Sequence, residues 1–429
     1  MLRVVIIGGG WAGCAAALEA KKTGPADEII LLERCDMLLG TGLVGGIMSN
    51  NGRFTASEEL IAMGSGELFQ VTNKVLRHKN IDFPGHRHAS LYDVVKIEPA
   101  VKHRLSSDGI KIYLNTRVVD VKKDSQGLLS VITVDGREFS GDVFIDTSGT
   151  AGPPGNCAKY GNGCVMCIYR CPTFGPRTSI AARAGLEEKV GLNDDGLIGS
   201  MSGSCKLSKD SLDKSIVQEL NNKGVVVIPI PRELRKKDDL LRIKACQQYT
   251  EKEFEENIVL LDTGHAKLMS PYYPLELLRQ VSGLENARFE DPYSGGVGNS
   301  MRFLAISPCN VFLQTKGIEN LFCAGEKAGP LVGHTEAIIT GTLAGYNAVR
   351  WARQRALLSL PETLACGDMI AQVCQAVETD KGLAQRYSFS GGIYFKRMQD
   401  KGLYTTDIER IKKSVEKAGM TGIFNHFNN

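Results

Sequence analysis

Residues 3–33, RVVIIGGGWAGCAAALEAKKTGPADEIILLE, contain the pattern that decides the fold. A short apolar run precedes three glycines with the spacing G-x-G-x-x-G, at Gly8, Gly10 and Gly13. An alanine-rich segment of helical composition follows, and a second apolar run ends at Glu33. The order of strand, glycine turn, helix, strand and terminal acid is that of a dinucleotide-binding βαβ unit.

Each part of this pattern has a physical task. Gly8 allows the tight turn, Gly10 lets the backbone approach a pyrophosphate, and Gly13 lets the helix pack close to the strand. The helix N-terminus offers N–H groups and the positive end of its dipole to the phosphates. Glu33 can accept hydrogen bonds from ribose hydroxyls, and its charge disfavours the 2′-phosphate of NADP. We therefore predict a dinucleotide site, with a non-binding turn of Rossmann type as the alternative.

The remainder of the chain favours FAD over NAD. Residues 110–150 predict strands joined by turns at 124–127 and 135–136, and the last strand, 143–145, runs into DTSGTAG. NLFCAGEKAG, near residue 320, predicts another short strand, and a helix is expected from about Thr335. No second complete G-x-G-x-x-G unit follows, so we expect no separate NAD(P)H domain.

This order resembles FAD-binding flavoproteins of the glutathione-reductase-like class. The resemblance implies an α/β fold, with a Rossmann-like parallel sheet crossed by a β-meander. It places Val118 at the adenine, Gly149 in the turn after the third strand, and Gly325 and Glu326 near the ribityl chain. It also points the N-terminus of the last helix at the flavin pyrimidine, where the dipole favours negative charge. His334, at the start of that helix, is a candidate for flavin or substrate contact and for a catalytic role.

The positions of glycine- and proline-rich stretches along the chain predict three parts. Residues 1–150 and 301–355 form a discontinuous FAD-binding domain, 151–300 form an inserted α+β substrate domain, and 356–429 form a helical tail. The charged run 232–244 is interrupted by leucine and isoleucine, which favours a solvated amphipathic helix. A contact with a polyanion is the alternative for this run.

Five blocks of sequence resemble, in order, the GidA/MnmG and TrmFO group of flavoproteins. They are IGGGWAGCAAA (7–17), the block 46–75 that begins GIMSNN, VSGLENA (281–287), FLQTKGIENLFCAGEK (312–327) and GHTEAIITGTLAGYNAVR (333–350). The resemblance implies modification of uridine in tRNA with FAD and a folate carbon donor. It also makes a homodimer the expected oligomer.

The sequence departs from this group at the positions of its reactive thiols. Met48 stands where the tRNA methyltransferase members carry a cysteine, and Asn50 stands where the GidA type carries its thiol. Neither side chain can act as a thiolate nucleophile. Only residues 351–429 follow Arg350, so we expect no counterpart of the long helical C-terminal domain of GidA.

A cysteine-dense stretch, GNGCVMCIYRCP (161–172), has no counterpart in that resemblance. Cys164, Cys167 and Cys171 have the spacing C-x2-C-x3-C-P, part of the bacterial ferredoxin pattern. With Cys157 or Cys205 as a fourth ligand, they predict a 4Fe–4S cluster. A zinc site, a dithiol at Cys164 and Cys167 that exchanges electrons with the flavin, and buried thiols without function are the alternatives. The other cysteines are expected to lie mostly in the core.

Two further pairs of residues are weaker candidates. His86 and His88 lie in FPGHRHAS, which we expect to be an exposed loop, with metal binding as the less favoured role. Arg177 and Arg183 flank SIAA and could hold an acidic substrate.

Composition limits the class of protein. Hydrophobic residues make up 43% and charged residues 23% of the chain, and the net charge of +3 does not by itself indicate nucleic acid. No apolar run of about 18 residues predicts a membrane span. We expect a cytoplasmic protein, in which twelve cysteines would not form a disulfide framework.

These observations predict an FAD-dependent oxidoreductase that transfers hydride or electrons at the flavin. Its partner would be a small-molecule substrate or an electron carrier. The alternative is a uridine-modifying enzyme of the TrmFO/GidA type, in which Cys164 or Cys167 would replace the missing thiols. A third hypothesis is a non-catalytic FAD-bound scaffold.

Overall fold

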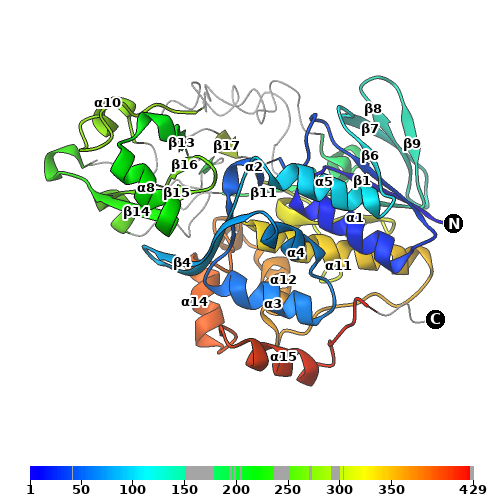
Figure 1. Ribbon diagram of the computed structural model, residues 1–429. Helices are drawn as coiled ribbons and strands as arrows, with labels where there is room; N and C mark the ends of the chain where they lie inside the picture. The colour runs from blue at the N-terminus through cyan, green and yellow to red at the C-terminus, as the bar shows by residue number, and fades with distance from the viewer. Residues whose placement is uncertain are drawn as a thin grey trace.

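A computed structural model describes most of the chain, and its elements fall into a main lobe and a second lobe (Figure 1). The main lobe contains both ends of the described chain, and the second lobe is built from residues within 205–290. The described residues are 1–40, 42–149, 178–192, 196, 200–202, 205–235, 252–269, 273–290, 300–302 and 304–425.

A five-stranded parallel sheet forms the centre of the main lobe. Ile6 lies opposite Ile145 on one side and Leu31 on the other. The prediction of an α/β fold with a parallel sheet is therefore confirmed. The strands, in spatial order, are β19 (Leu321–Cys323), β10 (Val143–Asp146), β1 (Arg3–Ile7), β2 (Glu28–Leu32) and β6 (Lys111–Tyr113).

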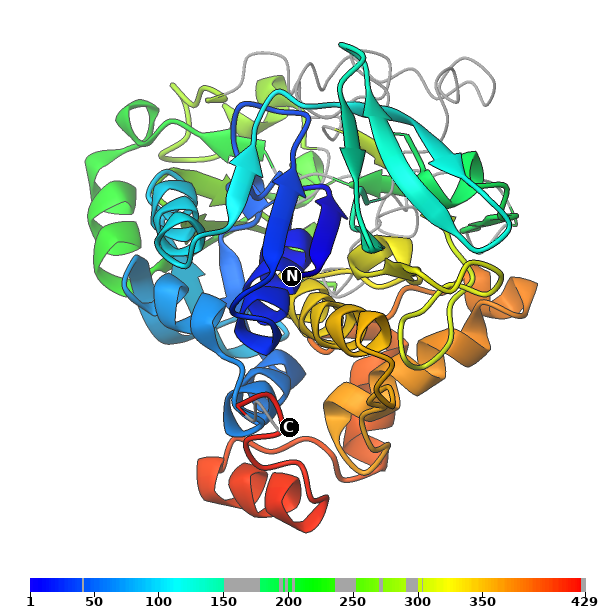
Figure 2. The ribbon, with the colours of Figure 1, turned by 90° about the vertical axis from the view of Figure 1, so that its right-hand side faces the viewer.

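Both faces of this sheet are covered, as its unbroken apolar strands require. Because successive strand residues point to opposite faces, Val4 and Ile6 join the core under the helices, whereas Val5 and Ile7 join the core under the meander. The helices are α1 (Trp11–Thr23), α5 (Ile97–Ser107) and α11 (His334–Ala352). The meander, visible in Figure 2, consists of β7 (Val118–Lys123), β8 (Leu128–Thr133) and β9 (Glu138–Ser140).

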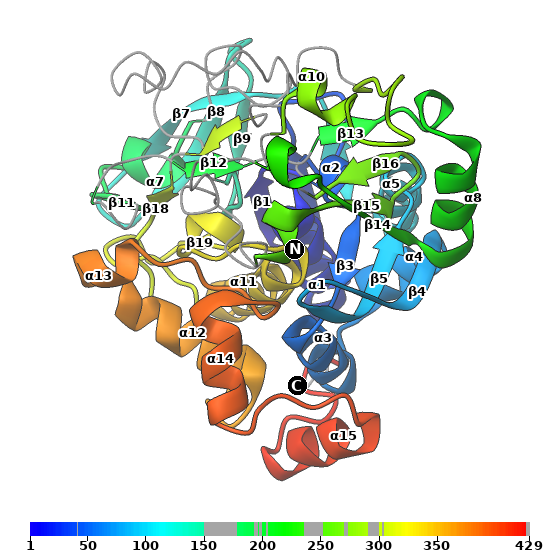
Figure 3. The ribbon, with the colours of Figure 1, turned by 90° about the vertical axis from the view of Figure 1, so that its left-hand side faces the viewer.

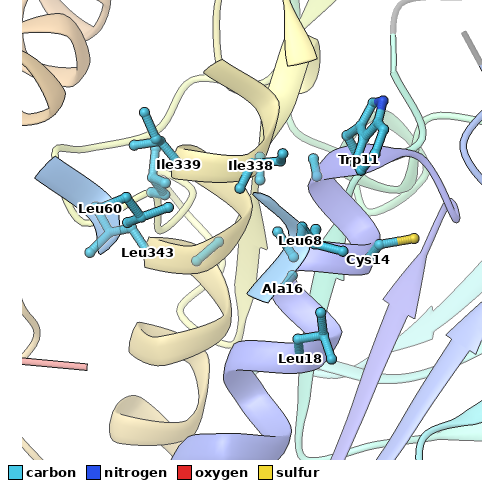
Figure 4. Close-up of a cluster of buried hydrophobic side chains, with 14 of the residues drawn as sticks. Trp11, Cys14, Ala16, Leu18, Leu60, Leu68, Ile338, Ile339 and Leu343 are labelled. Carbon is cyan, nitrogen blue, oxygen red and sulfur yellow. The ribbon is translucent and has the colours of Figure 1, made fainter. Parts of the chain in front are cut away.

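Helices α1 and α11 pack with their backbones in direct contact. A Cβ added at Gly341 would lie 2.2 Å from the carbonyl oxygen of Ala12, and one at Gly345 would lie 2.3 Å from that of Ala16. Small residues on both helices therefore make this approach possible. Figure 4 shows the buried side chains beside the contact, among them Ala16, Ile338 and Leu343.

A second, three-stranded sheet carries the segment that follows the βαβ unit. Its order is β3-β5-β4, and helix α3 (Gly52–Ala62) follows β3. His86 and His88 lie in β5, because a tight turn after Phe83 starts a hairpin. The expectation of an exposed loop is therefore wrong, and His86 is 1% exposed. The strands are β3 (Ile47–Ser49), β4 (Leu76–Phe83) and β5 (His86–Tyr92), and α4 (Glu67–Asn73) precedes β4.

The second lobe packs a four-stranded antiparallel sheet against α8 (Lys214–Lys223). Asp213 caps this helix by accepting a hydrogen bond from the Ser215 amide at 2.8 Å, and Gly224 ends it in the left-handed conformation. The strands, in spatial order, are β13 (Cys205–Leu207), β16 (Ala266–Leu268), β15 (Asn257–Asp262) and β14 (Val225–Pro229), and α10 (Leu275–Leu278) follows. Of the charged run 232–244, only the start is described, and Arg232–Leu234 form a 3-10 helix rather than an α-helix.

A buried carboxylate joins the two lobes. Asp262, at the end of β15, is 0% exposed and contacts three basic side chains. Arg77 Nε lies 2.8 Å and His78 Nε2 lies 2.9 Å away, both from β4 of the main lobe. Lys209 Nζ, from the second lobe, lies 2.6 Å away. These basic groups hold the pKa of Asp262 below its usual value despite its burial.

The last part of the described chain forms helices that pack on α3 and α11 (Figure 3). Phe389, Tyr394 and Met398 are buried in the main core. In α15, Ile411 is buried, whereas Ile408 at its start is 42% exposed. The helices are α12 (Ala365–Ala376), α13 (Asp380–Leu383), α14 (Gly392–Asp400) and α15 (Ile408–Lys417). The domain boundaries stay predictions.

Within the described ranges, the structure contains no helix that is both long enough and apolar enough to cross a bilayer.

The carboxyl of Glu19, buried in α1, makes stability depend on pH. It is 1% exposed, and burial raises its pKa to about 8, although Lys22 lies 3.9 Å away. The folded protein therefore holds this proton more tightly than the unfolded chain does. The stabilisation is complete below pH 4.5 and is lost as the pH rises towards 8.

We expect Glu19→Gln, which keeps the shape of the neutral acid, to flatten this dependence. In urea unfolding the wild-type protein should lose roughly 3 kcal/mol more than the variant between pH 5 and pH 8. Equal slopes for the two proteins would contradict the assignment.

Candidate functional site

The glycine turn forms an open cradle at the N-terminus of α1. Gly8 has a φ of +105°, and a Cβ there would lie 2.5 Å from the carbonyl oxygen of Thr147. A Cβ at Gly13 would lie 1.9 Å from the Gly8 oxygen. A Cβ at Gly10 would meet no atom of the described residues within 4 Å. Gly8 and Gly13 therefore serve close packing, whereas Gly10 faces the space that a pyrophosphate needs.

Glu33 lies at the end of β2, beside this cradle. Its Oε2 accepts a hydrogen bond from the Gly9 amide at 2.7 Å, and its Oε1 accepts one from the Cys35 amide at 2.9 Å. The Thr116 amide donates to the carbonyl of Glu33 at 2.8 Å, which brings the start of β7 to the same edge. Val118 begins β7 with its side chain in the core. The positions of Glu33 and Val118 agree with a role at the adenosine, which stays a prediction.

The turn after β10 is closed by Asp146, which the sequence analysis missed. This fully buried carboxylate accepts hydrogen bonds from the amide and hydroxyl of Ser148, at 3.0 and 2.6 Å. The Thr147 hydroxyl donates to the carbonyl of Ile7 at 2.9 Å. Gly149, with a φ of +77°, follows this turn. The turn therefore lies directly beside the end of β1.

The end of β19 reaches the same edge. Gly325 has a φ of +65°, and its amide donates to Thr340 Oγ1 at 2.9 Å. A Cβ at Gly325 would lie 3.1 Å from Cβ of Ala12, so the turn sits against the start of α1. Glu326 is half-buried in the following 3-10 helix. The carboxyl ends of β1, β10 and β19 thus converge, as in ligand sites of parallel sheets.

His334 is the first residue of α11, as predicted, and contacts residues 42–48. Its Nδ1 lies 3.1 Å from the carbonyl oxygen of Ile47 and 3.3 Å from Oη of Tyr92. A Cβ at Gly45 would lie 1.9 Å from His334 Cε1, so this glycine packs directly on the ring. The N-terminus of α11 is therefore fixed against residues 42–48. A flavin contact or catalytic role for His334 stays a prediction.

Two lysines of the second lobe also contact residues 42–48. Lys206 and Lys267 lie opposite each other on β13 and β16. Lys206 Nζ donates to the carbonyl of Leu43 at 3.0 Å, and Lys267 Nζ donates to the carbonyl of Gly45. Like charges directly opposite each other normally destabilise a strand pair, so these carbonyls offset part of the repulsion. No local sequence signal indicates this contact, because it joins distant segments.

Met48 and Asn50, which stand where the resemblance places reactive thiols, are both buried and engaged in other contacts. Met48 is 3% exposed and belongs to the main core. Asn50 is 0% exposed, and its Nδ2 lies 2.8 Å from Nδ1 of His86. Arg53 Nη1 donates to Oδ1 of Asn50 at 3.4 Å. His86 thus supports the turn through Asn50.

A buried ion pair fixes this turn to α11. Arg53, 2% exposed, and Glu336, 1% exposed, contact each other through Nε at 3.1 and 3.0 Å. Arg53 Nη2 also donates to the carbonyl of Val332 at 3.0 Å. The Phe389 amide donates to Glu336 Oε1 at 2.8 Å. One ion pair therefore joins α3, α11 and the tail.

The cysteine-rich stretch lies outside the described residues. Cys157, Cys164, Cys167 and Cys171, together with Arg177, are therefore not placed by the structure. Arg183 is exposed at the end of a short helix. Among the residues that are described, no three or more His, Cys, Asp or Glu side chains are grouped to hold a metal ion.

The described cysteines agree with a mostly core role. Four are buried, and Cys35 and Cys374 are half-buried. Burial raises the pKa of the Cys14, Cys323 and Cys366 thiols. Thiols with raised pKa values are poor nucleophiles at neutral pH.

The parallel sheet, the meander and the glycine cradle define a dinucleotide-binding flavoprotein fold. The profile of the family described as "Glucose inhibited division protein A" matches residues 3–259 and 247–356, so the chain belongs to this family. This confirms the expected GidA-type family.

Curated relatives match shorter segments. The chain is 32% identical over 121 residues to the tRNA uridine 5-carboxymethylaminomethyl modification enzyme MnmG of Desulfotalea psychrophila, covering 28% of this chain and 18% of that protein. It is 34% identical over 87 residues to the enzyme of the same name from Nitratiruptor sp., covering 20% and 13% respectively. The chain therefore aligns with less than a fifth of each relative.

Solved structures show the same fold. GidA of Aquifex aeolicus, in its form II crystal, has a TM-score of 0.61 and 18% identity, covering 97% of this chain and 76% of that chain. The form I crystal gives a TM-score of 0.58, with 16% identity and coverage of 97% and 78%.

The residues of the cradle fit FAD. The open space at Gly10 lies at the N-terminus of a 13-residue helix, where phosphates bind. The indole Nε1 of Trp11, the first residue of that helix, is buried and has no hydrogen-bond partner among the described residues. Both features agree with a ligand that is large and carries acceptor oxygens.

Proposed function

We propose that the chain is an FAD-dependent enzyme that modifies uridine in tRNA. The observation that carries this proposal is the match to the GidA family across both halves of the FAD cradle, from β1 to α11. The names of the two curated relatives supply the substrate class. The FAD-binding fold alone would support only a general oxidoreductase.

The residues at the sheet edge have separable tasks in this proposal. Bound FAD would supply the redox chemistry. Gly10 and the N-terminus of α1 bind the pyrophosphate, and Glu33 accepts hydrogen bonds from the ribose. The N-terminus of α11, with His334, supplies positive potential on the other side of residues 42–48. Lys267 adds a cation from the second lobe to the same segment.

One observation favours a second candidate function. Met48 and Asn50 are buried, and Asn50 is engaged with His86 and Arg53. A reaction that needs a thiolate in this turn is therefore excluded for this chain. Hydride or electron transfer between the flavin and a small molecule or electron carrier needs no such thiol. If uridine attack requires a cysteine, Cys164 or Cys167 must supply it.

Nucleoside analysis separates the two candidates. tRNA from cells that lack the gene should lose one modified uridine, detected by mass spectrometry of digested nucleosides. The wild-type gene should restore it, and the Gly10→Ala variant should not. Unchanged tRNA nucleosides, together with turnover of the bound flavin by small-molecule substrates, would favour the oxidoreductase.

The 4Fe–4S cluster stays a prediction, and it is tested on the same protein. Iron and acid-labile sulfide should be measured after purification without oxygen, for the wild type and for Cys164→Ser. Iron that is present in the wild type and reduced in the variant would support the cluster. Flavin without iron or sulfide would leave Cys164 and Cys167 as candidate redox or nucleophilic thiols.

A further inference from the structure

Trp11 carries a buried polar atom that protein packing does not explain. Its side chain is 3% exposed, and its ring lies 6.0 Å from that of Tyr92 and 5.8 Å from that of His334, between centroids. These contacts account for the apolar surface of the indole. They leave Nε1 without an acceptor among the residues that the structure describes.

An orphaned indole N–H is costly and uncommon. Buried tryptophan usually finds a hydrogen-bond partner for Nε1, and a buried donor without one costs about 1–3 kcal/mol. A smaller apolar ring would avoid this cost. The tryptophan therefore needs an explanation beyond packing.

The location of this atom points to the dinucleotide. Trp11 directly follows Gly10, the one glycine of the motif that faces open space. Its Nε1 is directed away from the apolar cluster formed by α1 and α11, as Figure 4 shows. A Cβ added at Gly42 would lie 2.5 Å from Nε1, so the atom faces a position without a side chain. The cradle and the orphaned donor thus occur at one helix N-terminus.

We propose that the indole N–H of Trp11 is a specific ligand of FAD and donates a hydrogen bond to an oxygen of the bound dinucleotide. The proposal rests on FAD binding but not on the identity of the substrate. It adds a side-chain donor to the backbone amides of the α1 N-terminus. Gly42 keeps the space beside the indole nitrogen clear.

The direct test follows the indole proton. The chain has two tryptophans, so Trp351→Phe leaves one indole resonance in protein labelled with ¹⁵N-tryptophan. Adding FAD to the apoprotein should move this resonance downfield, as expected when the N–H gains an acceptor. A resonance that stays in place while FAD binds would overturn the proposal.

A matched pair of variants gives a second readout. Trp11→Phe keeps an aromatic ring but removes the donor. Trp351→Phe makes the same change near the C-terminal end of α11, away from the α1 N-terminus. FAD affinity, measured by flavin fluorescence titration, should weaken roughly tenfold in Trp11→Phe and stay unchanged in Trp351→Phe.

The outcomes distinguish this proposal from the proposed function. Equal FAD affinity of Trp11→Phe and the wild type would refute the donor role, even if tRNA modification is intact. Weaker FAD binding by Trp11→Phe would support the donor role, even if no tRNA is modified. If Trp11→Phe fails to fold, the resonance of Trp351→Phe still decides.

Discussion

Alanine at Gly10 should strongly weaken FAD binding while leaving the apoprotein folded. The added methyl group would lie more than 4 Å from every atom that the structure describes, and Gly10 has an ordinary extended backbone with φ −69°. It would instead occupy the space where a pyrophosphate approaches the α1 N-terminus. We expect FAD affinity to fall by roughly 100-fold. The free energy of unfolding of the apoprotein should change by no more than about 1 kcal/mol.

Gly13→Ala is the matched comparison for this variant. Its Cβ would lie 1.9 Å from the backbone oxygen of Gly8, so β1 and α1 would have to separate. This variant should lose both FAD binding and stability, because a backbone atom cannot move aside cheaply. Isothermal titration with FAD and urea unfolding would be run on both proteins. Wild-type affinity in Gly10→Ala would show that the dinucleotide does not approach this glycine.

The contrast between these glycines shows how far local sequence can predict the site. The spacing of Gly8, Gly10 and Gly13, with Glu33 at the end of the next strand, predicts the cradle because all these residues lie within one βαβ unit. The contacts of that unit are short-range and follow from its own geometry. The structure adds that, of these three glycines, only Gly10 faces space that no described residue fills.

The contacts that complete the site could not be predicted in this way. Lys206 reaches Leu43 across 163 positions of the chain, and Lys267 reaches Gly45 across 222. Nothing local in a short strand indicates which distant backbone its lysine will contact. The same holds for Asn50 and His86, whose pairing depends on the hairpin that places β5 beside β3.

Removing one partner of the Arg53–Glu336 pair should have the largest effect on stability. Both groups are buried, and their pairing joins the turn after β3 to the N-terminus of α11. Arg53→Met would leave a buried carboxylate without its cation, and Glu336→Leu would leave a buried guanidinium. Each change should cost about 3–5 kcal/mol in urea unfolding. Each should also weaken FAD binding, because the N-terminus of α11 is predicted to lie at the flavin.

The double variant Arg53→Met/Glu336→Leu separates the charge effect from lost packing. It should be more stable than the sum of the two single changes predicts, since neither charge is then left alone. Arg87→Met, at an ion pair whose arginine side chain is 73% exposed, is the control and should change stability by less than about 1 kcal/mol. Additive losses in the double variant would mean that the two charges are not coupled to each other. In that case each residue would contribute through its own hydrogen bond, Glu336 by accepting from the Phe389 amide and Arg53 by donating to the carbonyl of Val332.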